Sequence, residues 1–173
     1  HVINITDVGH HNGKRALDKT GTTYDAVVQN LYSFSTFNVD DVVAKINLLG
    51  AKFIGVSADG GSRAMGALDP YGYHAYITDK TNSNVLPGTL THSPGCIAGQ
   101  CCTGLNGSGV APDGPGGTCR SVFSIASTGA GLGTSIVDGV AAVLNSVTFD
   151  VHVQAYNDAA ETIDVVGSFI QRV

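Results

Sequence analysis

Asp7 is the residue whose place in the sequence most clearly suggests chemistry. It follows an apolar run at residues 2–5, which predicts a short buried strand with Asp7 at its carboxyl end. In open α/β sheets, ligands bind at the carboxyl ends of the strands. A carboxylate, together with hydroxyls and water, suits Mg²⁺ or Ca²⁺, because these ions prefer oxygen ligands. We therefore treat Asp7 as a candidate cation ligand. The alternative is that its carboxylate only caps the turn that follows.

The four cysteines lie between residues 96 and 119, in a stretch rich in glycine and proline. Such a composition predicts a surface loop without a helix or a buried strand. An even number of cysteines in this loop predicts two disulfides among Cys96, Cys101, Cys102 and Cys119. The neighbours Cys101 and Cys102 should not pair with each other, because that ring is strained, and two pairings remain open. Disulfides indicate an oxidising compartment, so we expect a secreted or surface-displayed protein.

A zinc site is the alternative interpretation of these cysteines. Zinc sites usually combine two Cys-x₂₋₄-Cys pairs, whereas the far end of this stretch supplies only Cys119. The same stretch contains Asn106-Gly-Ser108, which matches the acceptor pattern for N-glycosylation. Asn106 is therefore a candidate glycosylation site for a eukaryotic source.

Histidines near the first strand allow two interpretations. A free amino-terminal His1 could form a copper-binding brace, as in oxidative polysaccharide-cleaving enzymes, but those are all-β proteins and helices are predicted here. The plainer interpretation is that His10 and His11 form a solvated pair in a loop. No Gly-x-Ser-x-Gly stands at a strand-to-helix turn. Residue types alone nevertheless leave a Ser-His-Asp triad open.

The glycine-rich turn at residues 127–133 follows a predicted strand, a place typical of phosphate binding. The dinucleotide pattern Gly-x-Gly-x-x-Gly fails, because Thr134 stands where its last glycine belongs. No lysine follows, as a P-loop requires. We therefore do not expect a nucleotide site.

Hydrophobic periodicity predicts alternating strands and helices. In chain order, we expect strands at 2–5, 52–57 and 121–126, helices at 38–49, 73–80 and 134–144, and a short helix from Ser62 to residue 68. Residues 73–80 also suit a strand. Asn38 or Asp40 should cap the first helix, and Thr134 or Ser135 the last. This order predicts an α/β fold with an open parallel sheet of Rossmann-like type. Clean alternation at 148–156 then predicts the start of a β segment.

Composition excludes several classes of protein. The 173 residues suffice for one domain with a core, and the 43% hydrophobic and 13% charged residues speak against disorder. The net charge of −5, with nine scattered Lys and Arg, argues against nucleic-acid binding. No apolar run reaches the length of about 18 residues that a membrane span needs. There is neither a signal-peptide pattern nor an initiator Met, so we expect the chain to begin inside a longer precursor.

Three stretches together resemble the second half of a von Willebrand factor A-type domain. They are most similar to the A-like domain of integrin β subunits and its bacterial relatives. The stretches are 2–11 with its Thr6-Asp7 pair, 41–56 with a helix and the next strand, and 124–140 with the last strand and helix. The resemblance implies that residues 1–147 are the carboxyl-terminal half of such a domain. It also implies that 148–173 begin or edge an adjoining β-rich domain, as in the integrin hybrid domain.

The resemblance implies a metal-ion-dependent adhesion site in which Asp7 is one ligand of Mg²⁺ or Ca²⁺. The backbone at Ser127 would help to hold an adjacent cation. The principal ligands of the family, an Asp-x-Ser-x-Ser motif, are absent from this sequence. The first strand would also show an unpaired apolar edge, which natural proteins avoid. We therefore expect a companion segment that supplies the missing amino-terminal half.

These features lead us to expect an extracellular, non-catalytic binding or adhesion module. Its partner would be a protein ligand or a further copy of itself, without nucleic acid and without a membrane span. The first alternative is a structural subunit of a surface filament or layer without a metal, because low charge, high glycine and loop disulfides suit it equally well. The second alternative is a secreted metal-dependent enzyme.

Overall fold

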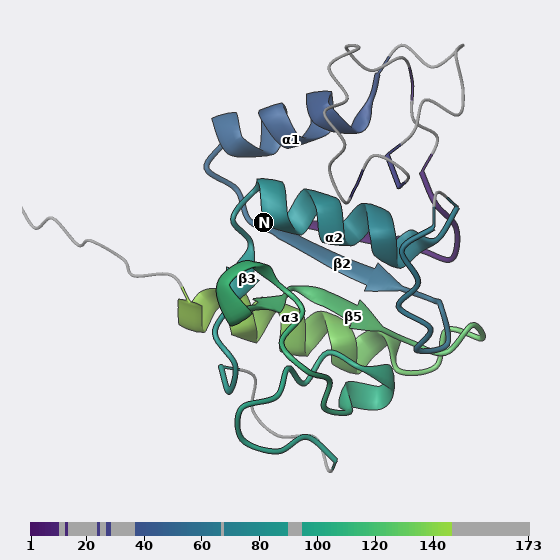
Figure 1. Ribbon diagram of the computed structural model, residues 1–173, viewed down its shortest axis with the longest axis vertical. Coiled ribbons are helices and arrows are strands. Elements are labelled where there is room, and N and C mark those ends of the chain that lie inside the picture. Colours follow the sequence, from purple (N-terminus) through teal and green to yellow (C-terminus); the bar gives the residue numbers. More distant parts are fainter. Residues whose placement is uncertain are drawn as a thin grey trace, which may run out of the picture.

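A computed structural model of the chain describes residues 1–10, 13, 24, 27–28, 37–66, 68–89 and 95–146. The main elements alternate between strand and helix, as predicted from the sequence (Figure 1). They are β1 (Val2–Thr6), α1 (Val39–Leu48), β2 (Phe53–Ser57), α2 (Pro70–Lys80), β5 (Val122–Ser124) and α3 (Leu132–Ser146). The strand expected at 148–156, and the boundary expected after residue 147, lie outside the described residues.

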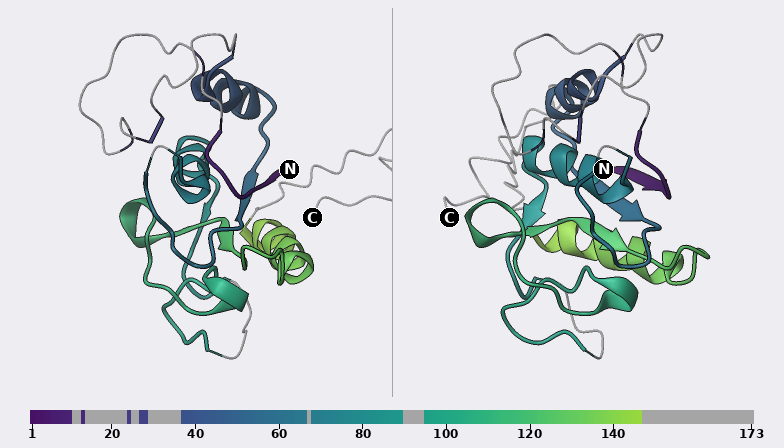
Figure 2. Two further views of the ribbon diagram at one scale, coloured as in Figure 1. Left: turned by 90° about the vertical axis from the view of Figure 1, so that its right-hand side faces the viewer. Right: turned by 45° about the vertical axis from the view of Figure 1, so that its right-hand side comes forward.

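The three main strands form one parallel sheet in the order β1-β2-β5. Helices α1 and α2 lie on one face of this sheet, and α3 lies on the other (Figure 2). Parallel strands need crossover connections, and α1 and α2 provide the two crossovers. The predicted α/β fold with an open parallel sheet is confirmed, and it is compatible with a Rossmann-like arrangement.

Helix α1 begins with a complete capping box. The Asn38 side chain accepts hydrogen bonds from the backbone N–H groups of Asp40 and Asp41, at 2.9 and 3.2 Å. Asp41 in turn accepts the Asn38 N–H at 2.8 Å. Of the two caps expected from the sequence, Asn38 is the one used, because it satisfies two otherwise unpaired helix donors.

Helix α3 packs closely on the sheet at Gly139. A Cβ atom at this position would lie 2.8 Å from Ile54 Cγ2 and 3.0 Å from Phe123 Cε2, so only glycine allows this approach. The helix begins at Leu132, so Thr134 and Ser135 lie inside it and the expectation that either caps it was wrong.

The short helix expected from Ser62 is absent from the described residues 61–66 and 68. Gly61 and Arg63 have positive φ angles of 87° and 49°, which end right-handed helical geometry. The Asp59 carboxylate accepts both of their N–H groups, at 2.9 and 3.1 Å, and fixes a turn instead. Residues 73–80, for which the sequence left helix and strand both open, form a helix. This helix starts at Pro70, since proline is favoured at the first helical position.

The segment with the cysteines contributes to the core, which corrects the expectation of a plain surface loop. The disulfides are Cys96–Cys102 and Cys101–Cys119, so the two neighbours do not pair with each other, as expected. All four cysteines are buried against Ile54, Val85 and Phe123. The disulfides themselves supply the apolar material that the sequence of this segment lacks.

Short regular elements also occur around this segment. They are β3 (Asn84–Val85) paired antiparallel with β4 (Cys119–Arg120), and the 3₁₀ turns η1 (Leu105–Gly107) and η2 (Pro115–Gly117). The buried Cys119 therefore belongs to a strand, which the composition did not predict. In Figure 1 the teal and green segment forms the lower part of the molecule, at the opposite end from α1.

Among the described residues, none of the helices combines the length and the apolar character that crossing a membrane requires.

Candidate functional site

The carboxyl ends of the three parallel strands meet at one edge of the sheet. The N–H of Ala58, just after β2, donates to the Thr6 carbonyl at 2.9 Å. The N–H of Gly60 donates to the Ile125 carbonyl, just after β5, at 3.0 Å. The loops that begin with Asp7 and that contain Ser127 therefore lie at the edge where ligands bind in open α/β sheets.

Asp7 and Ser127 are both exposed at this edge. Asp59 also follows β2 here, but its carboxylate accepts two backbone N–H groups of its own turn. Within the described ranges no group of three His, Cys, Asp or Glu residues is placed to hold a metal ion. The described residues thus fit one corner of a cation site. A Mg²⁺ or Ca²⁺ ion at Asp7 would need further oxygen ligands from elsewhere.

A chain of polar side chains runs beneath α2, between the sheet and the helix. Ser57 lies 2.9 Å from His74 Nδ1, and His74 Nε2 lies 2.8 Å from Asn4 Oδ1. The same Asn4 oxygen lies 3.0 Å from His10 Nε2. Since an amide oxygen only accepts, both histidines donate from Nε2, and Ser57 donates to His74 Nδ1.

Burial keeps the imidazoles of His74 and His10 neutral. Burial, followed by the proximity of His10, lowers the pKa of His74 to about 3. Burial also lowers the pKa of His10. The His74 ring lies directly against β2, where a Cβ at Gly55 would come within 2.6 Å of His74 Cγ. Glycine at residue 55 therefore creates the space that this histidine occupies.

These hydrogen-bonded side chains place Ser57 and His74 as in a catalytic triad, with Asn4 in the third position. Ser57 is 0% exposed, so its hydroxyl cannot reach a dissolved substrate in this conformation. The contacts are those of a buried hydrogen-bonded network, which fixes β1, β2 and α2 relative to one another.

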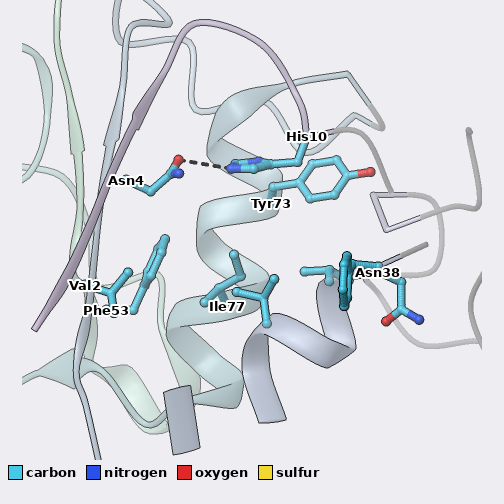
Figure 3. Close-up of a pocket in the computed structure, with 10 residues that line it drawn as sticks. Val2, Asn4, His10, Asn38, Phe53, Tyr73 and Ile77 are labelled. Atoms are coloured by element: carbon cyan, nitrogen blue, oxygen red, sulfur yellow. Dashed lines mark hydrogen bonds between the residues drawn. The ribbon is translucent and has the colours of Figure 1, made fainter. Parts of the chain in front are cut away.

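A pocket of about 230 Å³ adjoins the same network, between β1, α1 and α2. In Figure 3, Val2 and Asn4 point from β1 toward Tyr73 and Ile77 of α2, and Asn4 meets His10 across the top of the pocket. The lining is mostly apolar. His10 is therefore a partly buried member of a network, and the expectation of a solvated His10–His11 pair was wrong for His10. His11 lies outside the described residues.

The sequence patterns did not predict that Asn4, Ser57 and His74 belong to a site. Asn4 carried a signal, because it is a polar residue within an apolar strand, on the same side as Val2. His74 carried none, since its partner Asn4 is 70 residues away in the sequence.

A second group of charged side chains ties α2 to the segment with the disulfides. Arg63 pairs with Asp113 at 2.5 Å, and Arg120 pairs with Asp79 at 2.8 Å. Burial alone would raise the pKa of Asp113, but Arg63 and the hydrogen bonds to this carboxylate hold it below its ordinary value. Burial raises the pKa of Tyr71, which donates to Asp113, to about 12. The Asp113 carboxylate is thus charged at neutral pH.

The outer edge of β1 is open in the described part of the molecule. The Val2 N–H donates to the Lys52 carbonyl, just before β2, at 2.8 Å. The Thr6 carbonyl accepts from the Ala58 N–H, just after β2, at 2.9 Å. Peptide groups alternate along a parallel strand, so those of Ile3 and Ile5 point away from β2. No described residue pairs with β1 on that side.

The side chains of Ile3 and Ile5 are also exposed, by 39% and 47%. They lie beside Ile54 and Val56, their partners in the register of β2, on the face that α3 covers. Helix α3 packs mainly on β2 and β5. Within the described residues, the edge of β1 therefore presents apolar side chains together with backbone groups that have no partner there, which isolated proteins avoid.

Two remaining predicted sites can be placed. Asn106 is exposed in η1, and its glycosylation stays a prediction. The four cysteines are all used in disulfides, which excludes the zinc interpretation for this conformation.

Comparison with protein-family models, with curated proteins and with solved structures finds no match to this chain.

Proposed function

We propose that this chain is part of an extracellular, non-catalytic binding module of the von Willebrand factor A type. In this proposal a companion segment adds to the edge of β1. A divalent cation, held by Asp7 together with ligands from that companion, captures a carboxylate of a protein ligand. The observation that supports the proposal most is the open edge at Ile3 and Ile5, on the strand whose end carries Asp7.

The two disulfides support the extracellular part of the proposal, because such bonds persist in oxidising compartments. They suit a secreted protein or one displayed on a cell surface. The cation part is supported by Asp7 alone, so we assign Mg²⁺ or Ca²⁺ on the preference of these ions for oxygen.

Hydrogen exchange at β1 tests the companion. We expect the amides of Ile3 and Ile5 to exchange slowly in the native assembly and fast in the isolated chain. Ile5→Thr should weaken the assembly, whereas Ile97→Thr should not, because Ile97 is also an exposed isoleucine but lies in the segment with the disulfides. Fast exchange of both amides in native material would refute the companion.

Intact-mass measurement of the native assembly identifies what pairs with β1. A different polypeptide supports the proposal. A second copy of this chain contradicts it and favours the structural-subunit alternative. An edge strand can pair with either partner, so this measurement separates the two.

Titration of the native assembly with Mg²⁺ and Ca²⁺ tests the cation. We expect Asp7→Asn to lower the cation affinity, because the substitution removes a charged oxygen ligand. The control Asp41→Asn changes an exposed aspartate at the start of α1 and should leave the affinity unchanged. Equal affinity in the two variants would remove Asp7 from the site.

A further inference from the structure

The pocket of about 230 Å³ between β1, α1 and α2 has a mostly apolar lining (Figure 3). Each of the three elements contributes an aliphatic side chain, namely Val2 from β1, Val42 from α1 and Ile77 from α2. The rings of Phe53 and Tyr73 also line the pocket. An apolar cavity of about 150 Å³ can hold benzene, so this pocket has room for an aromatic ring with a small substituent.

The pocket opens to solvent beside α1. Phe37 and Val42, which line it there, are exposed by 71% and 43%. Phe53 and Ile77, which line it as well, are only 2% and 3% exposed. A dissolved molecule can therefore enter beside α1 and bury a ring against Phe53 and Ile77, which is favourable because apolar surface leaves water.

No charged side chain belongs to the part of the lining that the structure describes. His10 could gain a charge, but burial lowers its pKa, so its imidazole is neutral at neutral pH. An ionised ligand would lose its hydration here without an opposite charge to replace it. The lining therefore favours a neutral ligand.

Asn4 supplies a hydrogen-bond donor to this apolar surface. Its Oδ1 accepts from Nε2 of His10 and of His74, at 3.0 and 2.8 Å. Its Nδ2 carries two N–H donors and makes no hydrogen bond to a described residue. The two histidines hold the amide in place, so Nδ2 is a fixed donor whose apolar surroundings favour an acceptor from a ligand.

We propose that this pocket binds a small, neutral aromatic molecule with one oxygen acceptor, such as an aromatic ketone. The ring of the ligand packs against Phe53 and Ile77, because aromatic pairs are favourable and apolar surface is buried. The oxygen of the ligand accepts a hydrogen bond from Asn4 Nδ2. Apolar burial supplies the affinity, and the single donor fixes the orientation of the ligand.

This inference does not depend on the proposed function. The pocket lies between β1 and the helices α1 and α2, whereas the proposed companion adds to the outer edge of β1 and the proposed cation binds at Asp7. Binding of an aromatic ketone can therefore succeed or fail independently of either.

Calorimetric titration of the full chain, with its disulfides intact, tests the proposal with acetophenone as the probe. We expect saturable binding at millimolar concentration or below. Benzoate, which has the same ring with a charged group, should bind at least about tenfold more weakly, because its carboxylate is dehydrated without compensation. Absence of saturable acetophenone binding, or equal binding of benzoate, overturns the proposal.

An NMR titration tests the hydrogen bond from Asn4 without a variant that risks unfolding. We expect acetophenone to shift the side-chain N–H resonances of Asn4 and the methyl resonances of Val42. Ethylbenzene, which has a similar shape but no oxygen, should shift the methyl resonances and leave those of the Asn4 amide nearly unchanged. Unchanged Asn4 resonances at saturating acetophenone overturn the assignment of the donor.

A pair of matched variants tests the location. Val42→Trp places a large side chain at the mouth of the pocket, so it should weaken acetophenone binding at least about tenfold. Val137→Trp is the control, because Val137 is also an exposed valine on a helix but lies on α3, at the other face of the sheet (Figure 2). Equal affinity of the two folded variants overturns the assignment to this pocket.

Discussion

The two edge strands of the sheet, β5 and β1, differ in whether their outward backbone groups have hydrogen-bond partners among the described residues. On β5, the outward N–H of Ser124 donates to the Thr103 carbonyl at 2.9 Å, and the outward carbonyl of Val122 accepts from Arg63. On β1, the corresponding groups of Ile3 and Ile5 have no described partner. The segment with the disulfides covers the edge at β5, whereas no described residue covers the edge at β1.

The difference shows what covering an edge requires. The segment over β5 has few apolar residues, so two disulfides and the pair Arg63–Asp113 hold it in place. No described residue covers β1 in a comparable way, yet the exposed residues of β1 are isoleucines rather than the charged residues that protect a free edge. An edge built of isoleucine is suited to burial against a partner.

Removal of the disulfide that anchors the covered edge should have the largest effect. We expect Cys101→Ala with Cys119→Ala to cost about 3 kcal/mol of the free energy of unfolding, because this bond closes the longer loop, with a sequence separation of 18. The pair Cys96→Ala with Cys102→Ala, with a separation of 6, should cost about 2 kcal/mol. Denaturant unfolding without reductant measures both, and the reverse order would contradict the loop argument.

Acid should destabilise the fold by protonating His74, whose side chain links α2 to Asn4 of β1. The pKa of His74 is about 3 in the folded chain and 6.5 in the unfolded chain, so the unfolded state binds more protons between these values. Stability is therefore lost as pH falls from 6.5 toward 3, and about 2 kcal/mol should be gone at about pH 5. His10, which faces His74, acts in the same direction.

Urea unfolding at several pH values measures this loss. His74→Gln retains hydrogen-bonding capacity but cannot titrate, so stability should fall less steeply with acid in this variant. Parallel curves for the two proteins would show that another group causes the acid sensitivity.

The contact of α3 with the sheet should be sensitive to a single methyl group. We expect Gly139→Ala to cost at least about 1 kcal/mol, because its Cβ would clash with Ile54 and Phe123. Gly133→Ala is the matched control in the same helix. It has nothing within 4 Å of its Cβ, so it should stabilise the chain by about 0.5 kcal/mol. Thermal unfolding of both variants gives the comparison, and a neutral Gly139→Ala would mean that α3 can shift.

How far the sequence predicted these regions depends on the range of the interactions. The three main strands and the cap of α1, which was expected at Asn38 or Asp40, depend on neighbouring residues, so local patterns predicted them. The burial of the cysteines and the link from Asn4 to His74 depend on contacts between distant segments. Composition suggested a plain surface loop for the segment with the cysteines. Nothing in the sequence around His74 indicated its contact with Asn4.

The smallest effect on stability should come from the open edge itself, and it is the most informative about the partner. Ile5→Thr removes apolar surface that is already 47% exposed, so the free chain should change by no more than about 0.5 kcal/mol. The same change should weaken pairing of a companion with β1, because threonine keeps the strand but loses the apolar contact. Unfolding of the free chain and assembly with native partner material measure the two effects separately. A large loss of stability in the free chain would mean that Ile5 is covered within the chain itself, and the contrast between the two edges would then disappear.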